Sequence, residues 1–175
     1  MKRPFRTSDG SPLFWPLFGT TAIVSAAMAA IDGFGELPGG IVAFEFAAAS
    51  ESSTAAFVAD YRGSLRKSIF VALSIGLDYL FMAVYSTWLA YSCAQIANQN
   101  FCPRLGSILV WFSWLAAFFD AIENFGLLML LLERPYSEFG KLTFFCVCAK
   151  FAILVTGLLY CVAGVIALSG KKKSA

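Results

Sequence analysis

The segment LAAFFDAIENFGLLMLLL, residues 115–132, places two carboxylic acids and an amide in a stretch that is otherwise apolar. The polar residues are Asp120, Glu123 and Asn124, and the apolar run around them extends from residue 106 to residue 132. A helix needs about 20 apolar residues to cross a bilayer, so this run predicts a membrane span. A carboxylate at membrane depth costs several kcal/mol, so these acids require a partner, a proton or a functional role.

The composition is that of an integral membrane protein. Apolar residues make up 59% of the 175-residue chain, 18 residues are phenylalanine, and the mean hydropathy is +0.73. A soluble domain is usually about 45–50% apolar, and here the excess is concentrated in four runs. The formal net charge of +2 does not indicate a nucleic-acid partner. The chain has no histidine, which excludes histidine-ligated haem, histidine-based zinc sites and histidine acid–base catalysis.

The five cysteines do not form a recognisable motif. None belongs to a Cys-x-x-Cys pair, so the sequence predicts neither a disulfide framework nor a metal site. We interpret them as small buried apolar residues, with Cys93 and Cys102 placed so that they can meet near one membrane face.

The four apolar runs predict four membrane spans, at residues 13–31, 69–97, 106–132 and 142–168. The loops between the last three are short, which makes neighbouring spans antiparallel. We therefore predict one all-α domain over residues 1–175, an integral membrane four-helix bundle. The basic start, the apolar run and the Ala-Met-Ala motif at residues 27–29 also fit a cleaved signal peptide, and both interpretations of the first segment stay open.

Residues 41–61 have a different character from the spans. Glu45, Glu51 and several serines interrupt their apolar residues, so the segment is too polar to cross a membrane. It predicts a short interfacial helix between spans 1 and 2 that lies on the membrane surface or dips into it.

The basic residues predict the orientation. With four spans both ends lie on one side, which collects seven basic residues: Lys2, Arg3, Arg6, Arg104, Lys171, Lys172 and Lys173. The other side holds five: Arg62, Arg66, Lys67, Arg134 and Lys141. Because positive residues favour the cytoplasmic side, we expect both termini in the cytoplasm and place the protein in a bacterial inner membrane.

Ionisable residues in three spans are expected at one depth. At 1.5 Å per residue, Asp78, Glu123 and Lys150 each fall roughly 5–8 Å to the outer side of the bilayer centre, and Asp120 lies just inward of this layer. Polar and small residues also share stripes at spacings of four and seven, which keeps them on one seam of a left-handed bundle. The stripes are Ser74, Asp78, Tyr85 and Ser92; Ser113, Asp120 and Asn124; and Thr143, Lys150, Gly157 and Gly164.

The charges of this interior do not balance. Asp78, Asp120 and Glu123 face only Lys150, and Glu45 from the surface segment would deepen the excess of negative charge. Either some carboxyl groups hold protons, or a cation or a ligand's positive group binds there. The alternative is purely structural: Lys150 pairs with Glu123, the other polar groups complete the network, and the network fixes the helix register.

Four short elements together resemble a group of small bacterial four-span membrane proteins of uncharacterised function. They are VAFEF at 42–46, DYLFMAVY at 78–85, DAIEN at 120–124 and KF at 150–151, and the Asp-x-x-Glu-Asn element is the most specific. The resemblance covers residues 15–165. It implies the four-span layout and includes Glu45 in the site, but it implies no catalytic role.

From these patterns we predict a membrane protein with a buried polar pocket that binds a proton, a cation or a lipid-like ligand. Its binding residues are Glu45, Asp78, Tyr85, Asp120, Glu123, Asn124 and Lys150. The sequence identifies no catalytic residue, cofactor or metal ligand. Membrane lipids are the expected partners, together with other membrane subunits or further copies of the chain. The alternative functions are an accessory or assembly subunit of a larger membrane complex, and a membrane-embedded lipid enzyme that uses a carboxylate acid–base pair.

Overall fold

The computed structural model describes residues 13–37 and 39–173, and these ranges are helical apart from short turns. The helices of this described part are α1 (Phe14–Gly35), α2 (Gly40–Ala47), α3 (Glu51–Arg62), α4 (Leu65–Asn98), α5 (Pro103–Leu131) and α6 (Tyr136–Lys173).

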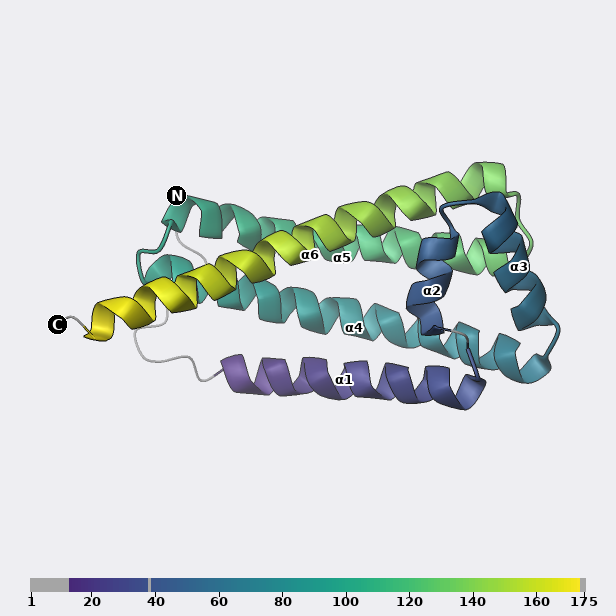
Figure 1. Ribbon diagram of the computed structural model, residues 1–175, viewed down its shortest axis with the longest axis horizontal. Helices are drawn as coiled ribbons and strands as arrows, with labels where there is room; N and C mark the ends of the chain where they lie inside the picture. Colours follow the sequence, from purple (N-terminus) through teal and green to yellow (C-terminus); the bar gives the residue numbers. More distant parts are fainter. Residues whose placement is uncertain (1–12, 38, 174–175) are drawn as a thin grey trace.

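Four of the helices are long and run along the long axis of the molecule (Figure 1). These are α1, α4, α5 and α6, and each has the length and apolar composition needed to cross a membrane. The protein is therefore an all-α, multi-pass membrane bundle, as the sequence predicts. The short helices α2 and α3 lie together at the end opposite the C-terminal end of α6, which we call the cap end.

The long helices extend beyond the predicted spans. The apolar run of the second span begins at residue 69, but α4 already begins at Leu65. The run of the fourth span begins at residue 142, but α6 already begins at Tyr136. The difference has a physical reason, because hydropathy marks the part of a helix that lies in lipid, whereas the helix itself ends at its capping residues and turns.

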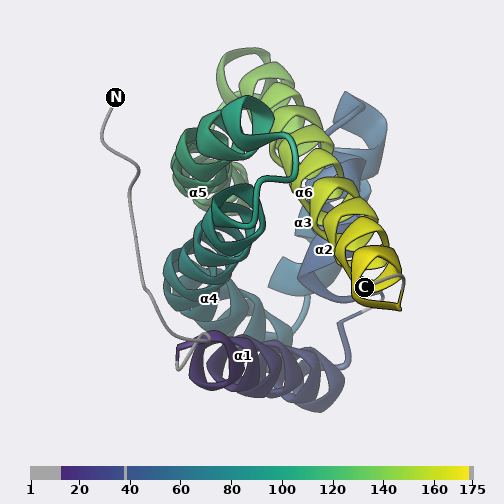
Figure 2. The same ribbon diagram turned by 90° about the vertical axis from the view of Figure 1, so that its left-hand side faces the viewer.

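The helices are arranged so that α2 closes a gap in the bundle. α5 packs against both α4 and α6, and α1 packs along the outer side of α4 (Figure 2). Among the described helices α1 and α6 do not touch, and α2 contacts both. α2 therefore lies between α1 and α6 at the cap end.

Two apolar clusters leave room for polar residues between them. The cluster at the cap end includes Phe44, Ile75 and Leu127, and the cluster nearer the other end includes Leu89 and Leu109. On α4 and α5 the predicted site residues lie between these two sets along the helix. The apolar clusters thus bracket the polar residues and separate them from both ends of the bundle.

The segment at 41–61 differs from the prediction of one short interfacial helix. It forms two helices, and the first is buried, with Ile41, Phe44 and Glu45 all turned into the bundle. The second, α3, fits the interfacial expectation better, because most of its side chains are exposed. Its N-cap is Ser50, whose side chain accepts a hydrogen bond from the Ser53 N–H at 3.2 Å.

Asp32 fixes the position of α2. The chain turns through Gly39 and Gly40, both with positive φ, a backbone conformation that favours glycine. One Asp32 oxygen then accepts the N–H of Ile41 at 3.1 Å, and the other accepts the hydroxyl of Ser74 at 2.8 Å. A Cβ at Gly40 would collide with the Asp32 carboxylate. This link between α1, α2 and α4 directs Glu45 into the bundle.

The neighbour of Cys93 is not Cys102, the residue that the sequence allowed it to meet. The sulfur of Cys93 lies 3.8 Å from that of Cys161 on α6, whereas Cys102 is exposed. Sequence proximity favoured Cys102, but the packing of α4 against α6 brings Cys161 to Cys93 instead.

Candidate functional site: a buried acid–lysine cluster

All seven predicted site residues meet in one cluster inside the bundle. Each is at most 5% exposed. α2 contributes one, α4 two, α5 three and α6 one: Glu45, Asp78, Tyr85, Asp120, Glu123, Asn124 and Lys150. The seam residues of α4, α5 and α6 that the heptad spacing singles out are likewise buried. The prediction that these polar and small residues form buried stripes is therefore confirmed.

Lys150 lies at the centre of the cluster. Its Nζ atom is 2.9 Å from Oδ1 of Asp120, 2.9 Å from Oε1 of Glu123 and 3.4 Å from Oε1 of Glu45. An ammonium group has three protons to donate, and here each has a carboxylate oxygen in reach. The structural alternative drawn from the sequence paired Lys150 with Glu123 alone, so the actual set of partners is wider.

A close approach of α5 and α6 places Lys150. Gly126 of α5 faces Thr143 of α6 so closely that a Cβ at Gly126 would overlap the threonine hydroxyl. Lys150 follows Thr143 by seven residues, two turns along the same face of α6. Its ammonium group therefore reaches the carboxylates of α5.

Two neutral groups complete the cluster. The hydroxyl of Tyr85 donates to Oδ2 of Asp120 at 2.7 Å, so both oxygens of this acid are hydrogen-bonded. The amide nitrogen of Asn124 donates to Oδ2 of Asp78 at 2.7 Å. Asp120 and Lys150 therefore form the best-satisfied ion pair of the site.

The cluster carries more acid than base. The cluster holds four carboxyl groups and one ammonium group, so full ionisation would give a net charge of −3. Two like charges 4 Å apart repel by about 4 kcal/mol at an effective dielectric constant of 20. Such repulsion disfavours full ionisation. The position between three carboxylates, where a bound cation would lie, is already occupied by the Lys150 ammonium group.

Buried oxygen atoms show where protons are needed. With all acids ionised, Oε2 of Glu45, Oε2 of Glu123 and Oδ1 of Asn124 are buried and have no hydrogen-bond partner. An unsatisfied buried polar atom costs about 1–3 kcal/mol. The carboxyl groups of Glu45 and Glu123 are close enough to share a hydrogen bond once one of them carries a proton.

The environment of Glu45 favours its protonated form. Burial raises the pKa of the Glu45 carboxyl, and the negative charge of Asp120 acts in the same direction. The ammonium group of Lys150 and the hydrogen bond with Glu123 lower this pKa, but burial outweighs them.

The residues around Asp78 offer a second place for a proton. Asn124 donates to one oxygen of Asp78, while the amide oxygen of Asn124 has no donor. A proton on Asp78 gives that amide oxygen a donor and closes a reciprocal acid–amide pair. This arrangement is complete in itself and does not involve Lys150.

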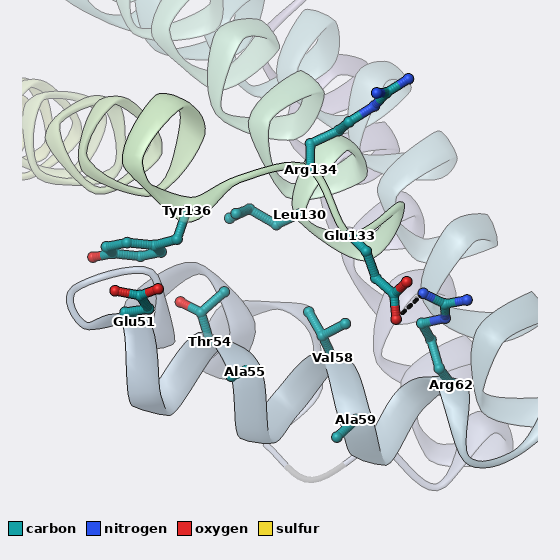
Figure 3. Close-up of a pocket in the computed structure, with 10 residues that line it drawn as sticks. All are labelled: Glu51, Thr54, Ala55, Val58, Ala59, Arg62, Leu130, Glu133, Arg134 and Tyr136. Atoms are coloured by element: carbon teal, nitrogen blue, oxygen red, sulfur yellow. Dashed lines mark ion pairs between the residues drawn. The ribbon is translucent and has the colours of Figure 1, made fainter.

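A second candidate feature lies at the cap end, on the surface. A groove with a volume of about 290 Å³ runs between α3 and the turn from α5 to α6 (Figure 3). Tyr136 lies above Glu51 at one end, and an Arg62–Glu133 ion pair lies at the other. None of the seven cluster residues lines it. No sequence pattern indicates this groove, because its walls come from segments about 80 residues apart.

Sequence reasoning did not single out Asp32. The available signal was an acidic residue directly before a glycine-rich turn, a position from which carboxylates often accept backbone N–H groups. Among the described residues, no group of three or more histidine, cysteine or acidic side chains forms a metal-binding arrangement.

Comparisons of the chain with protein-family models, with curated proteins and with solved structures gave no match. The resemblance to small bacterial four-span proteins therefore stays a prediction.

Proposed function

We propose that this protein binds protons inside the membrane, with the Glu45–Glu123 pair as the exchangeable site. The observation that carries the proposal is the pair of buried carboxyl groups that each keep one oxygen without a donor beside a lysine already shared with Asp120. One proton between the two glutamates supplies the missing hydrogen bond and removes one negative charge. A buried carboxyl pair in which one proton both completes a hydrogen bond and removes a charge is a proton-binding site.

The remaining acids have supporting roles in this proposal. Asp120 serves as the fixed partner of Lys150, because Lys150 and Tyr85 both donate to it. In this proposal Asp78 also carries a proton, because that proton gives the amide oxygen of Asn124 a donor.

The proposed orientation places the cap end on the outer side of a bacterial inner membrane and both termini in the cytoplasm. The support is the larger number of basic residues assigned to the side of the termini, seven against five. In this orientation the glutamate pair lies in the outer half of the membrane, near α2 and α3.

Infrared spectroscopy of the protein in lipid bilayers tests the proposal. A protonated carboxyl group has a C=O stretching band that shifts in D₂O, and exposed glutamates lose this band at neutral pH. We expect a band that persists at neutral pH, disappears at alkaline pH and is absent in Glu123→Gln. The matched control is Glu138→Gln, which removes an exposed glutamate and should leave the band unchanged.

The other outcomes overturn the proposal in distinguishable ways. A wild-type spectrum without a Glu123-dependent band at any pH would assign the cluster a structural role only. A band that sodium ions remove at constant pH would show that the site binds a cation in place of a proton.

A further inference from the structure

Two of the long helices, α4 and α6, meet along a seam in which a pair of cysteines is flanked by glycines. Three residues of α4 at spacings of four and three face three residues of α6 at the same spacings, so each set lies on one face of its helix. They are Leu89, Cys93 and Ile96 on α4, and Gly157, Cys161 and Gly164 on α6. A Cβ at Gly157 would collide with Leu89, and a Cβ at Gly164 would collide with Ile96. The two glycines therefore bring the backbone of α6 close to α4 on either side of the cysteines.

The sulfur atoms of Cys93 and Cys161 lie 3.8 Å apart. A disulfide bond is about 2.05 Å long and joins residues whose Cα atoms usually lie about 4.4–6.8 Å apart. The glycines on either side of Cys161 permit such an approach of the two backbones. The sulfurs then need to move together by only about 1.8 Å, which rotation of the two side chains supplies.

The two cysteines differ in their access to the surroundings. Cys93 is completely buried, whereas Cys161 is partly exposed. The neighbours of Cys161 on α6 include the exposed apolar residues Leu158 and Val162, and the helix has the length and composition of a membrane span. The medium in contact with Cys161 is therefore lipid, and a reagent that reaches its sulfur must be soluble there.

We propose that Cys161 and Cys93 reduce lipid hydroperoxides within the membrane and are converted by this reaction into a disulfide that links α6 to α4. A lipid hydroperoxide is a two-electron oxidant carried by the acyl chains themselves, so it has access to the exposed side of Cys161. The inference does not depend on the proposed proton site. Cys161 follows Lys150 by eleven residues, which places it about 16 Å along α6 from the acid cluster.

Each thiol takes part in one step of the reaction. In the first, the sulfur of Cys161 attacks the terminal oxygen of the hydroperoxide, the O–O bond breaks, and the Cys161 proton passes to the departing lipid oxygen. The products are a lipid alcohol and a sulfenic acid on Cys161. In the second, the sulfur of Cys93 attacks that of Cys161, the S–O bond breaks, and the hydroxyl group leaves with the Cys93 proton as water. Two thiols and one hydroperoxide thus give one disulfide, one alcohol and one water.

The test uses the reduced protein in bilayers that contain a phospholipid hydroperoxide. We expect mass spectrometry of the digested protein to show Cys93 joined to Cys161, and mass spectrometry of the lipids to show the corresponding alcohol. Cys161→Ala should lose the disulfide and one equivalent of alcohol per chain. Cys93→Ala should lose the disulfide but keep the alcohol, with a sulfenic acid on Cys161 that dimedone traps.

The matched control is Cys148→Ala, which removes an exposed thiol from the same membrane helix and should form the disulfide as the wild type does. Oxidised wild-type protein without the Cys93–Cys161 link would overturn the inference, because thiols that are only packed together stay reduced, and this measurement depends on no variant. Equal yields of alcohol from Cys161→Ala and wild type would contradict the assigned step at Cys161. A link that forms with hydrogen peroxide in the water phase but not with the lipid hydroperoxide would overturn the assigned substrate.

Discussion

Replacement of Lys150 by methionine removes the only cation in the acid cluster while keeping a long, flexible side chain. Three carboxylate oxygens lose a donor, two of them at 2.9 Å and one at 3.4 Å. Methionine fills much of the same volume, so the change is mainly electrostatic. The variant therefore measures how strongly the fold depends on this charge.

The expected loss of stability is large at neutral pH. Removing one partner of a buried ion pair typically costs about 3–5 kcal/mol, because the remaining charge is uncompensated. The loss should shrink as the pH falls. Without Lys150 the folded state of the variant binds protons on its acids more readily than the unfolded state, so its free energy of unfolding rises as the pH decreases.

The assay is reversible unfolding in mixed micelles with increasing sodium dodecyl sulfate, followed by the fluorescence of the four tryptophans. Lys141→Met is the matched control, since it removes an exposed lysine from the same helix and should change stability by no more than about 0.5 kcal/mol. A Lys150→Met/Asp120→Asn double variant should recover part of the loss, because it removes the acid that depends most on the lysine. Equal stabilities for Lys150→Met and wild type at neutral pH would refute the buried ion pair.

Three further changes have defined outcomes. Because burial raises the pKa of Glu45, the folded state binds its proton more tightly than the unfolded state, so the free energy of unfolding should fall as the pH rises through the window above the ordinary glutamate pKa. Glu45→Gln should flatten this slope, and an unchanged slope would argue against a proton on Glu45. Asp78→Asn should keep the infrared band and lower stability by less than about 1 kcal/mol, since asparagine resembles the protonated acid; a loss of several kcal/mol would show that Asp78 is ionised. Gly126→Val should destabilise the bundle by about 1–3 kcal/mol, because the added side chain overlaps Thr143. The control is Gly19→Val, since nothing lies within 4 Å of a Cβ added at Gly19. Equal losses of stability in the two variants would contradict the close approach of α5 and α6.

The sequence predicted the helical bundle and the composition of the cluster because both depend on periodicity. Apolar runs of sufficient length predict spans, and polar residues at spacings of four and seven predict one buried seam. Asp78, Asp120 and Lys150 could therefore be assigned to the interior from their positions alone.

The course of α2 could not be predicted in the same way. Glu45 is the single polar residue of this short helix, so its pattern does not show which way the helix faces, and only the contacts of Asp32 show that it turns inward. The sequence also could not show that Tyr85 donates to Asp120 or that Phe46 stacks on Phe151. These pairings depend on side-chain rotamers and on contacts between helices that are far apart in the chain.

Solid-state nuclear magnetic resonance of the protein in lipid bilayers can determine directly whether Lys150 joins carboxyl groups of two helices. The measurement is the dipolar coupling between the ¹⁵N-labelled Nζ of Lys150 and ¹³C-labelled carboxyl carbons, with Glu45→Gln and Glu123→Gln variants to assign each signal. The account predicts that Lys150 lies within ion-pair contact, about 4 Å between nitrogen and oxygen, of carboxyl groups from both α2 and α5. A Lys150 ammonium group without a carboxyl group in that range would contradict the account.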